Sequence, residues 1–355
     1  MTNVVLTSVN ENGVASLILN RPEAINSLST DMLEVIGEKL KEWEHDDQVR
    51  LVVLKGEGSK GFCAGGDIKT LYGAQNSSEA LEKAERFFEK EYVVDQLIYQ
   101  YSKPIIACLD GVVMGGGVGL TYGASHRIVT ERTKWAMPEM NIGFFPDVGA
   151  AYFLNQAPGH MARYLALTAS VIKAPDVLYI GGADAYMKSE KMDVFLSELE
   201  GINWHNKDVD AALNELTDKY TRSPEKEGQL HLIQEDVDQH FSYRTVEGIV
   251  HSLDNASSDF AKEAKEMLLS KSPSSLKVTL KQLMDGENKT IDECFHTDLI
   301  LAKNFMRHED FFEGVRSVLI DKDRNPQYKY PHLQDFSDEE VQKFFSPGGK
   351  ISTFS

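Results

Sequence analysis

The first half of the chain alternates between short apolar, β-branched runs and longer amphipathic segments. The runs VVLTSV and VASLILN flank the turn signal NENG, and this pattern predicts a β-hairpin. Apolar residues then recur at helical spacing, which predicts an amphipathic helix with Ser29 or Thr30 as its N-cap. Its predicted buried face consists of Met32, Leu33, Ile36, Leu40 and Trp43.

The pattern of strand, turn and helix then recurs. VRLVVLKG and PIIACLDG predict buried strands, and each is followed by a glycine-rich stretch, GEGSKGFCAGGD or GGGVGLTYGAS. SSEALEKAERFFEKEYVVDQLIYQY predicts a long amphipathic helix, whereas HRIVTE and KWAMPE predict short strands. The repetition predicts an α/β spiral and does not match the GxGxxG unit of dinucleotide-binding proteins.

The character of the chain changes at about Gly182, where strands become rare and charged helical segments take over. SPSSLKVTLKQL and the long segment that starts with TIDECFHTDLILAKNF both predict helices. We therefore predict a core over residues 1–200 that carries the functional site. A helical C-terminal region over residues 201–340 and a polar tail over residues 341–355 are expected to follow.

Composition and charge narrow the class of protein. The 355 residues are 42% hydrophobic, which is enough for a sizeable core. A formal net charge of -18 would repel a phosphate backbone, so nucleic acid is not expected as a partner. The three cysteines, Cys63, Cys108 and Cys294, give neither a disulfide framework nor a metal-site spacing. With no leader-like N-terminal pattern and no membrane-length apolar run, we expect a cytoplasmic protein without a membrane partner.

Two glycine-rich turns are the first candidates for chemistry. CAGGD (Cys63 to Asp67) and MGGGVG (Met114 to Gly119) each follow a predicted strand and precede a helix. Such turns let a ligand approach backbone N–H groups closely, and the start of a helix adds unpaired donors. Two facing turns could form an oxyanion hole, although each turn alone could equally serve close packing. Neither turn has the Lys-Ser/Thr ending of a phosphate-binding P-loop.

Two carboxylates lie in an otherwise apolar stretch, AMPEMNIGFFPDVGA. Glu139 and Asp147 each follow a proline, Pro138 or Pro146, which stiffens the backbone that carries them. A pair of acids at this spacing is common in so acidic a chain and would usually be exposed. Here the apolar flanks predict burial, a raised carboxyl pKa and a role in acid–base or nucleophilic chemistry.

Several motifs together resemble the enoyl-CoA hydratase/isomerase (crotonase) superfamily. They are NRPEAINSLS, GFCAGGDI, DGVVMGGGVGL and WAMPEMNIGFFPDVG, in the order and spacing of that superfamily. Within it, FFEKEY, GFFPDVGAAYFL and EGVRSVLIDKDRNP are most similar to the 3-hydroxyisobutyryl-CoA hydrolase group. Hydratases of this superfamily usually carry a glutamate directly after the glycine turn, where this chain has Gly119. The resemblance implies a crotonase-like α/β spiral of ββα units with a helical C-terminal region.

The resemblance also implies a set of site residues. The thioester carbonyl would accept hydrogen bonds from the backbone N–H groups of Gly66 and Gly116. Glu139 would be the principal catalytic carboxylate, with Asp147 as its partner and Glu91 as a further candidate near the substrate. The residues that would line the CoA-binding groove, largely through their backbone, are Ala24, Ala64, Asp67 and Ile68. No metal or redox cofactor is expected, because CoA is part of the substrate.

The hypothesis that follows is hydrolysis of a short β-hydroxyacyl-CoA, which the resemblance places in valine breakdown. Glu139 would either attack the carbonyl carbon or activate the attacking water, and the sequence does not choose between these roles. One alternative is hydration or isomerisation of an enoyl-CoA on the same scaffold. Another is a non-catalytic acyl-CoA binder. The expected partner is an acyl-CoA, and a homo-oligomer is possible.

Three further residues and one segment have competing interpretations. Cys63 is expected to be a packing residue and not a nucleophile, since no His lies nearby in sequence. Asp67 is expected to cap the helix that follows it. Glu91 lies on an amphipathic helix, where it could be solvated or could face the substrate. The segment WHNKD, which begins at Trp204, is expected to lie at the surface.

Overall fold

The computed structural model describes residues 3–348, and the chain divides into two compact units. The first, here called the sheet unit, comprises Met1–Gly66, Lys90–Trp135 and Ile172–Gln229. The second, the helical unit, comprises Asp67–Glu89, Ala136–Val171 and Leu230–Ser355. This division follows contacts in space, whereas the boundaries at residues 200 and 340 follow composition and stay a prediction.

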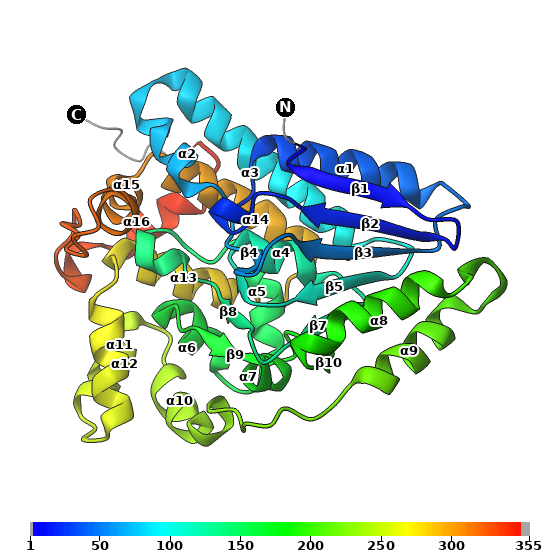
Figure 1. Ribbon diagram of the computed structural model, residues 1–355. Helices are drawn as coiled ribbons and strands as arrows, with labels where there is room; N and C mark the ends of the chain where they lie inside the picture. The colour runs from blue at the N-terminus through cyan, green and yellow to red at the C-terminus, as the bar shows by residue number, and fades with distance from the viewer. Residues whose placement is uncertain (1–2, 349–355) are drawn as a thin grey trace. The chain divides into compact units, whose positions relative to one another are not determined.

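The strands of the sheet unit form two sheets within the described residues. They are β1 (Val5–Val9), β2 (Val14–Leu19), β3 (Leu51–Gly56), β4 (Gly61–Cys63), β5 (Ile105–Leu109), β6 (Val112–Met114), β7 (His126–Val129), β8 (Lys134–Ala136), β9 (Ile172–Lys173) and β10 (Ala185–Tyr186). One sheet has the order β1-β2-β3-β5-β7-β10, as Figure 1 shows, and the other has the order β4-β6-β8-β9. The predicted hairpin is confirmed, because β1 pairs with β2 in antiparallel register from Val5↔Leu19 to Val9↔Ala15.

From β3 to β8, successive strands alternate between the two sheets, which gives the fold its spiral. β3, β5 and β7 lie in the first sheet and run parallel, whereas β4, β6 and β8 lie in the second. All five residues of β5 are buried, as expected for a parallel strand that is covered on both faces. The repeated strand pattern that the sequence predicts is therefore confirmed, and it places the end of β4 and the end of β6 in the same small sheet.

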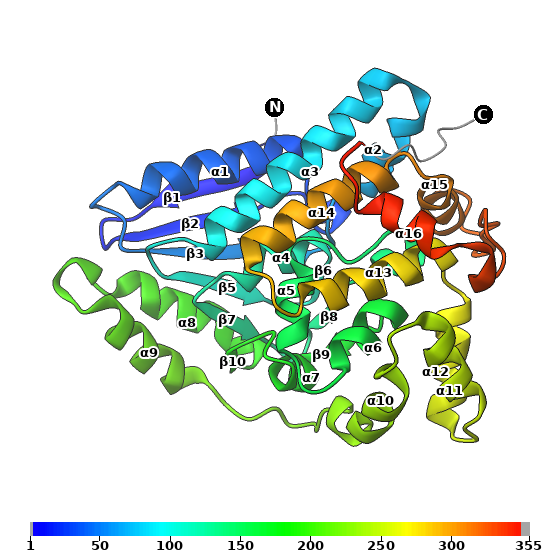
Figure 2. The ribbon, with the colours of Figure 1, turned by 180° about the vertical axis from the view of Figure 1, so that it is seen from behind.

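The helices of the sheet unit are α1 (Thr30–Glu44), α4 (Gly116–Tyr122), α7 (Ala174–Tyr179), α8 (Ser189–Gly201), α9 (Val209–Tyr220) and the later part of α3 (Ser78–Tyr99). The predicted buried face of α1 is confirmed, and the Ser29 hydroxyl caps the helix by accepting from Met32 N at 3.3 Å. Helices α8 and α9 run side by side (Figures 1 and 2) and join the core formed by Leu51, Val53 and Ile106 of the sheet.

Trp204 belongs to this core, so the expected surface position of the segment that begins there is wrong for its first residue. The side chain is fully buried, and its indole N–H donates to Leu199 O at 2.8 Å. Burial follows from packing against α8 and α9, which the polar residues after Trp204 do not reveal. His205, Lys207 and Asp208 are less buried, in keeping with the expectation.

The helical unit contains most of the remaining helices. They are α2 (Ile68–Tyr72), α5 (Ala150–Phe153), α6 (Met161–Thr168), α10 (Gln234–Phe241), α11 (Val246–Asp254), α12 (Asp259–Leu269), α13 (Pro273–Gly286), α14 (Ile291–Phe305), α15 (Glu309–Val315), α16 (Asp338–Phe344) and the first part of α3. Helices α13 and α14 both pack against α5 (Figure 2). Residues 341–344 of the predicted polar tail belong to α16, and residues 349–355 lie outside the described residues. In residues 3–348, every helix is too short or too polar to cross a membrane.

Candidate active site

The two glycine-rich turns lie against each other in the sheet unit. Gly65 has a φ of +97°, and a Cβ built there would lie 3.1 Å from Met114 O and 3.4 Å from Gly116 N. A Cβ on Gly117 would lie 2.7 Å from Cys63 O. Only glycine permits this approach of one backbone to the other, so the glycines both shape the turns and bring them together.

The backbone amides of Gly66 and Gly116 are the donors that the sequence analysis proposes. Gly116 is the first residue of α4, where the N–H has no acceptor within the helix. Gly115, just before it, has a φ of +52°, which glycine adopts without a steric penalty. Within residues 3–348 we find no backbone acceptor for either amide. The turns therefore present two main-chain donors in one small region of the sheet unit.

The backbone near Ala24 is hydrogen-bonded to Ala64, and Asn26 fixes the loop that follows Ala24. The amide of Ala64 donates to Ile25 O at 3.0 Å, directly after the short 3-10 turn Pro22–Ala24. Asn26 is fully buried with a φ of +54°, and its Nδ2 lies 3.0–3.2 Å from the carbonyl oxygens of Glu57, Gly61 and Phe62. Asn26 is not among the predicted site residues. The signal was available, because asparagine tolerates the left-handed region better than other residues with a Cβ.

Glu91 is buried beside the second glycine turn. It is 2% exposed, and a Cβ on Gly116 would collide with its Oε1. The solvated alternative for Glu91 is therefore wrong. Asp95, one helical turn later on α3, is also 2% exposed and was missed. The spacing of four residues between the two acids places them on one helix face and could have identified Asp95.

Cys63 is a packing residue, as expected. Its Sγ lies 3.2 Å from Asn26 O and accepts from Gly65 N at 3.4 Å. Burial raises the pKa of the thiol to about 12, and the negative charges of Glu91 and Asp95 act in the same direction. The thiolate needed for nucleophilic attack is therefore strongly disfavoured at neutral pH.

Asp67 and Ile68 begin the helical unit. Asp67 occupies the N-cap position of α2, but its side chain accepts no capping hydrogen bond, so the predicted side-chain cap is wrong. Its backbone oxygen instead accepts from Thr70 N at 3.0 Å. Ile68 is the first residue of α2 and is half-buried. Both residues follow Gly66 directly in the chain.

Glu139 and Asp147 are both buried in the helical unit, 8% and 5% exposed. Glu139 starts a 3-10 turn, Glu139–Ile142, and its Oε2 has no hydrogen-bond partner among the described residues. Burial raises the pKa of Glu139 well above its ordinary value, and the negative charge of Asp147 raises it further. The raised pKa predicted from the apolar flanks is confirmed. The electrostatic effect also shows that the two carboxyl groups interact.

Aromatic rings surround the segment between these two acids. Phe144 packs on four other rings at centroid distances of 4.6–5.5 Å. These rings belong to Phe88, Phe145, Phe305 and Phe311. A carboxylate held in such a region loses hydration, which explains why burial is the main cause of the raised pKa of Glu139.

The backbone after Asp147 is strained. Val148 has a φ of +52° and Gly149 a φ of +81°. A β-branched residue in the left-handed region costs about 1–3 kcal/mol and persists only where the surroundings hold it. Gln282 Nε2 donates to Pro146 O at 2.9 Å, and Gly149 N donates to Asp298 Oδ2 at 2.8 Å. Gln282 and Asp298 are not among the predicted site residues, and both lie more than a hundred residues further along the chain.

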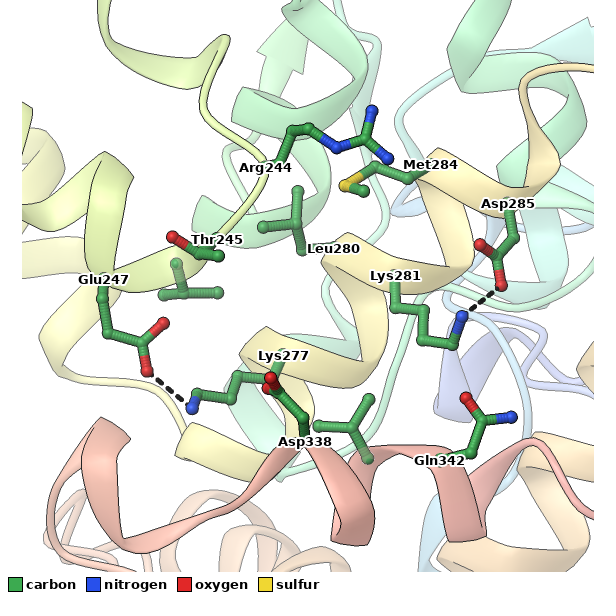
Figure 3. A pocket seen from close by; sticks show the side chains of 12 residues that line it. Arg244, Thr245, Glu247, Lys277, Leu280, Lys281, Met284, Asp285, Asp338 and Gln342 are labelled. Carbon is green, nitrogen blue, oxygen red and sulfur yellow. Dashed lines mark hydrogen bonds and ion pairs between the residues drawn. The ribbon is translucent and has the colours of Figure 1, made fainter.

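A separate cavity of about 360 Å³ lies among α11, α13 and α16 (Figure 3). Its charged lining residues are Arg244, Lys277, Lys281, Glu247, Asp285 and Asp338. Lys277 pairs with Glu247 at 2.6 Å and Lys281 with Asp285 at 2.7 Å, as the dashed lines in Figure 3 show. This balanced lining favours neither anions nor cations and includes no predicted site residue. Across residues 3–348, no cluster of His, Cys, Asp or Glu is arranged to hold a metal ion.

Known proteins resemble this chain in both sequence and fold. A sequence model described as enoyl-CoA hydratase/isomerase matches residues 14–345. The mitochondrial 3-hydroxyisobutyryl-CoA hydrolase of Rattus norvegicus is 40% identical over 95% of this chain and 88% of its own length. The Homo sapiens protein of the same name is 38% identical over 94% of this chain and 86% of its own length.

Two crystal structures match almost the whole chain. A carnitinyl-CoA dehydratase from Mycobacterium thermoresistibile has a TM-score of 0.90 and 34% identity, covering 98% of this chain and 97% of its own. An enoyl-CoA hydratase from Rhodobacter sphaeroides 2.4.1 has a TM-score of 0.88 and 32% identity, covering 99% of this chain and 100% of its own. These matches confirm the predicted crotonase-like α/β fold with its helical C-terminal region.

The comparisons also correct the expected location. The rat and human relatives are named mitochondrial, which contradicts the cytoplasmic location predicted from the sequence. That prediction was wrong because it relied on the first residues of the chain showing no leader-like pattern. The residues at the start of this sequence do not determine the compartment of the protein.

Proposed function

Because the chain belongs to the enoyl-CoA hydratase/isomerase family, we propose that it hydrolyses 3-hydroxyisobutyryl-CoA to 3-hydroxyisobutyrate and CoA. The observation that carries this proposal is the 40% identity, over 95% of the chain, with a protein named for that reaction. The two adjacent glycine turns and the buried carboxyl pair support the same chemistry. A place in valine breakdown follows from the substrate.

In the proposed mechanism, the sheet unit stabilises the thioester oxygen. The N–H groups of Gly66 and Gly116 donate to this oxygen as it gains negative charge during attack. Each such donor typically contributes about 2.7–4 kcal/mol to stabilising the transition state. Support comes from the adjacency of the two turns and from the absence of a backbone acceptor for either amide among the described residues.

The helical unit supplies the acid–base chemistry. Glu139, whose pKa is raised by burial and by the charge of Asp147, is in its carboxylate form a stronger base than an exposed glutamate. As a base, its carboxylate takes a proton from water while the water oxygen bonds to the carbonyl carbon. The C–S bond then breaks, and the thiolate of CoA takes up that proton. As a nucleophile, the carboxylate would instead bond to the carbonyl carbon, the C–S bond would break with loss of the CoA thiolate, and water would cleave the resulting mixed anhydride, with its second proton passing to the thiolate.

A single turnover in ¹⁸O-labelled water, with enzyme in excess, separates these two roles. Water that cleaves the anhydride at the Glu139 carbon leaves label in the Glu139 carboxylate, and only nucleophilic attack explains that result. Label found only in the released acid fits general-base catalysis as well as cleavage of the anhydride at the acyl carbon, and capture of the anhydride by hydroxylamine then identifies the nucleophilic route. Asp147 orients water or the substrate hydroxyl in either case. Its negative charge also raises the pKa of Glu139.

The remaining predicted residues are proposed to bind substrate. The backbone of Ala24 and Ala64, fixed by the Asn26 loop, and the start of α2 at Asp67 and Ile68 would contact CoA. Glu91 would lie near the acyl group, since it contacts the turn that carries Gly116. We propose that no cofactor is needed, because hydrolysis requires only water and the groups named here. Assembly into a homo-oligomer stays a prediction.

Hydration of an enoyl-CoA is the second candidate, because the two matching crystal structures are of proteins named as a dehydratase and a hydratase. Against it, residue 119 on α4 is glycine and supplies no carboxylate. A thiol-reactive dye assay on a panel of acyl-CoAs separates the candidates. Release of CoA from 3-hydroxyisobutyryl-CoA but not from crotonyl-CoA supports hydrolysis. Loss of crotonyl-CoA without free thiol supports hydration, and binding without any turnover supports a non-catalytic binder.

A further inference from the structure

The four residues that carry Asp147 are held at both ends by the C-terminal helices. Gln282 on α13 donates from Nε2 to Pro146 O at 2.9 Å, at the start of the segment Pro146–Gly149. Asp298 on α14 accepts from Gly149 N at 2.8 Å, at its end. Gln282 Nε2 also donates to Asp298 Oδ1 at 2.8 Å, so the two side chains form one connected bracket.

Both side chains of the bracket are buried in the helical unit. Asp298 is 0% exposed and Gln282 is 2% exposed. A Cβ on Gly149 would lie 2.8 Å from Ile291 Cδ1, so α14 packs directly on the end of the segment. Burying a carboxyl group is unfavourable unless its hydrogen bonds compensate, and both oxygens of Asp298 accept one. An apolar residue would fill this space without the cost of burying a carboxyl group. We therefore expect Asp298 to have a role beyond packing.

The segment needs an external constraint because its backbone is strained. Val148 is β-branched and has a φ of +52°, which a free chain would avoid. Such conformations persist where surrounding groups determine them, and they gather at functional sites. The two bracket hydrogen bonds fall on the residues that flank the pair Asp147 and Val148. They therefore fix the direction in which the Asp147 side chain leaves the backbone.

We propose that Asp298, together with Gln282, is a positioning residue that fixes the carboxyl group of Asp147 for catalysis. This inference rests on the proposed function, in which Asp147 assists Glu139. The two aspartates also interact electrostatically, since the charge of Asp147 contributes to raising the pKa of Asp298. Asp298 thereby acts on Asp147 through the backbone it holds.

The test is a double-mutant cycle on the full-length enzyme with 3-hydroxyisobutyryl-CoA as substrate. The variants are Asp298→Asn, Asp147→Asn and the double variant, with Asp259→Asn, which is exposed on α12, as the matched control. Asp298→Asn keeps the shape of the side chain but replaces one carboxyl oxygen by an NH2 group. That group then faces a second donor, either Gly149 N or Gln282 Nε2. Misplacing a catalytic group by about 1 Å can cost roughly a hundredfold in rate, so we expect kcat to fall ten- to a hundredfold with KM nearly unchanged.

In the Asp147→Asn background, the further change Asp298→Asn should have almost no effect, because the group it positions is already lost. A merely structural role would instead lower activity by the same factor in both backgrounds, and that result would overturn the inference. Wild-type kcat in folded Asp298→Asn would overturn it as well. Should that variant fail to fold, Gln282→Met removes the donor to Pro146 and should show the same dependence on Asp147.

A separate readout distinguishes failure of this inference from failure of the proposed function. Hydrogen exchange of the Gly149 amide should be faster in Asp298→Asn than in Asp259→Asn, whatever reaction the enzyme catalyses. Faster exchange in a protein that hydrolyses no acyl-CoA would reject the proposed function and the catalytic role of the bracket while leaving the anchoring intact. Unchanged exchange would reject the anchoring itself.

Discussion

The carboxyl group of Glu91 lies directly against the α-carbon of Gly116, so that a methyl group on residue 116 would collide with Oε1 of Glu91. Leu28 Cδ1 lies 3.2 Å from the same position. A buried acid and an amide proposed as an oxyanion donor are thus held in one packed region of the sheet unit. Glycine is required at residue 116 by the neighbouring carboxyl group, and at residue 115 by the turn, where φ is +52°.

Gly116→Ala is therefore expected to lower kcat by roughly a hundred- to a thousandfold, the usual effect of losing one oxyanion donor. The added methyl group must displace the buried Glu91 carboxyl group, which disturbs the proposed acyl-binding region, or the turn itself, which misdirects the amide. Steady-state assays with the thiol-reactive dye measure the loss. Gly201→Ala is the matched control, since a Cβ there meets nothing within 4 Å. Equal activity in both variants would contradict the assigned role of Gly116.

Glu139→Gln is expected to reduce kcat by roughly a hundred- to ten-thousandfold, the range that general acid–base catalysis contributes. The amide keeps the volume of the side chain but cannot take a proton or attack the carbonyl carbon. Binding of CoA, measured by calorimetry, should persist. Glu263→Gln on α12, an exposed glutamate, should behave as wild type. Near-normal turnover by Glu139→Gln would remove the proposed mechanism.

Local features of this molecule could be predicted from the sequence, and long-range ones could not. The Ser29 cap and the buried face of α1 depend on neighbours within a few residues, and both predictions were confirmed. The burial of Glu139 followed from its apolar flanks in the same way. Glycine spacing identified two turns that could form a site, and the sheet order then placed them side by side.

The missed residues share the property that their role depends on distant parts of the chain. Asp298 bonds to Gly149 across 149 residues, and Gln282 bonds to Pro146 across 136. On its own helix, Asp298 resembles any polar residue of an amphipathic segment. Trp204 stands beside polar residues, and only the packing of α8 and α9 shows that it is buried. Patterns of neighbouring residues contain none of this information.

Asn26→Ala is expected to destabilise the sheet unit. The Asn26 amide reaches the carbonyl oxygens of Glu57, Gly61 and Phe62, which would be left buried with fewer donors. Each buried polar group that loses its partner costs about 1–3 kcal/mol, so the loss in unfolding free energy should be at least in this range. Urea unfolding measures it. Asn12→Ala, at an exposed loop, provides the comparison, and an equally small effect of both changes would contradict the anchoring role of Asn26.

Asp298→Asn is expected to change the way stability depends on pH. Burial is the main cause that raises the pKa of Asp298 from 3.8 to about 8, with the charge of Asp147 adding to it and that of Lys289 opposing it. Below about pH 4 this carboxyl group is protonated in both the folded and the unfolded chain, and its contribution to stability is fully present. As pH rises towards 8, the unfolded chain releases the proton while the folded chain retains it, so wild-type stability falls.

An amide has no such proton, so the Tm of Asp298→Asn should decline less than that of wild type between pH 5 and 8. Other titrating groups, including the histidines and Glu139, are common to both proteins and cancel in the difference. Parallel Tm curves across this range would show that Asp298 is already ionised in the folded protein, contrary to the effect of its burial.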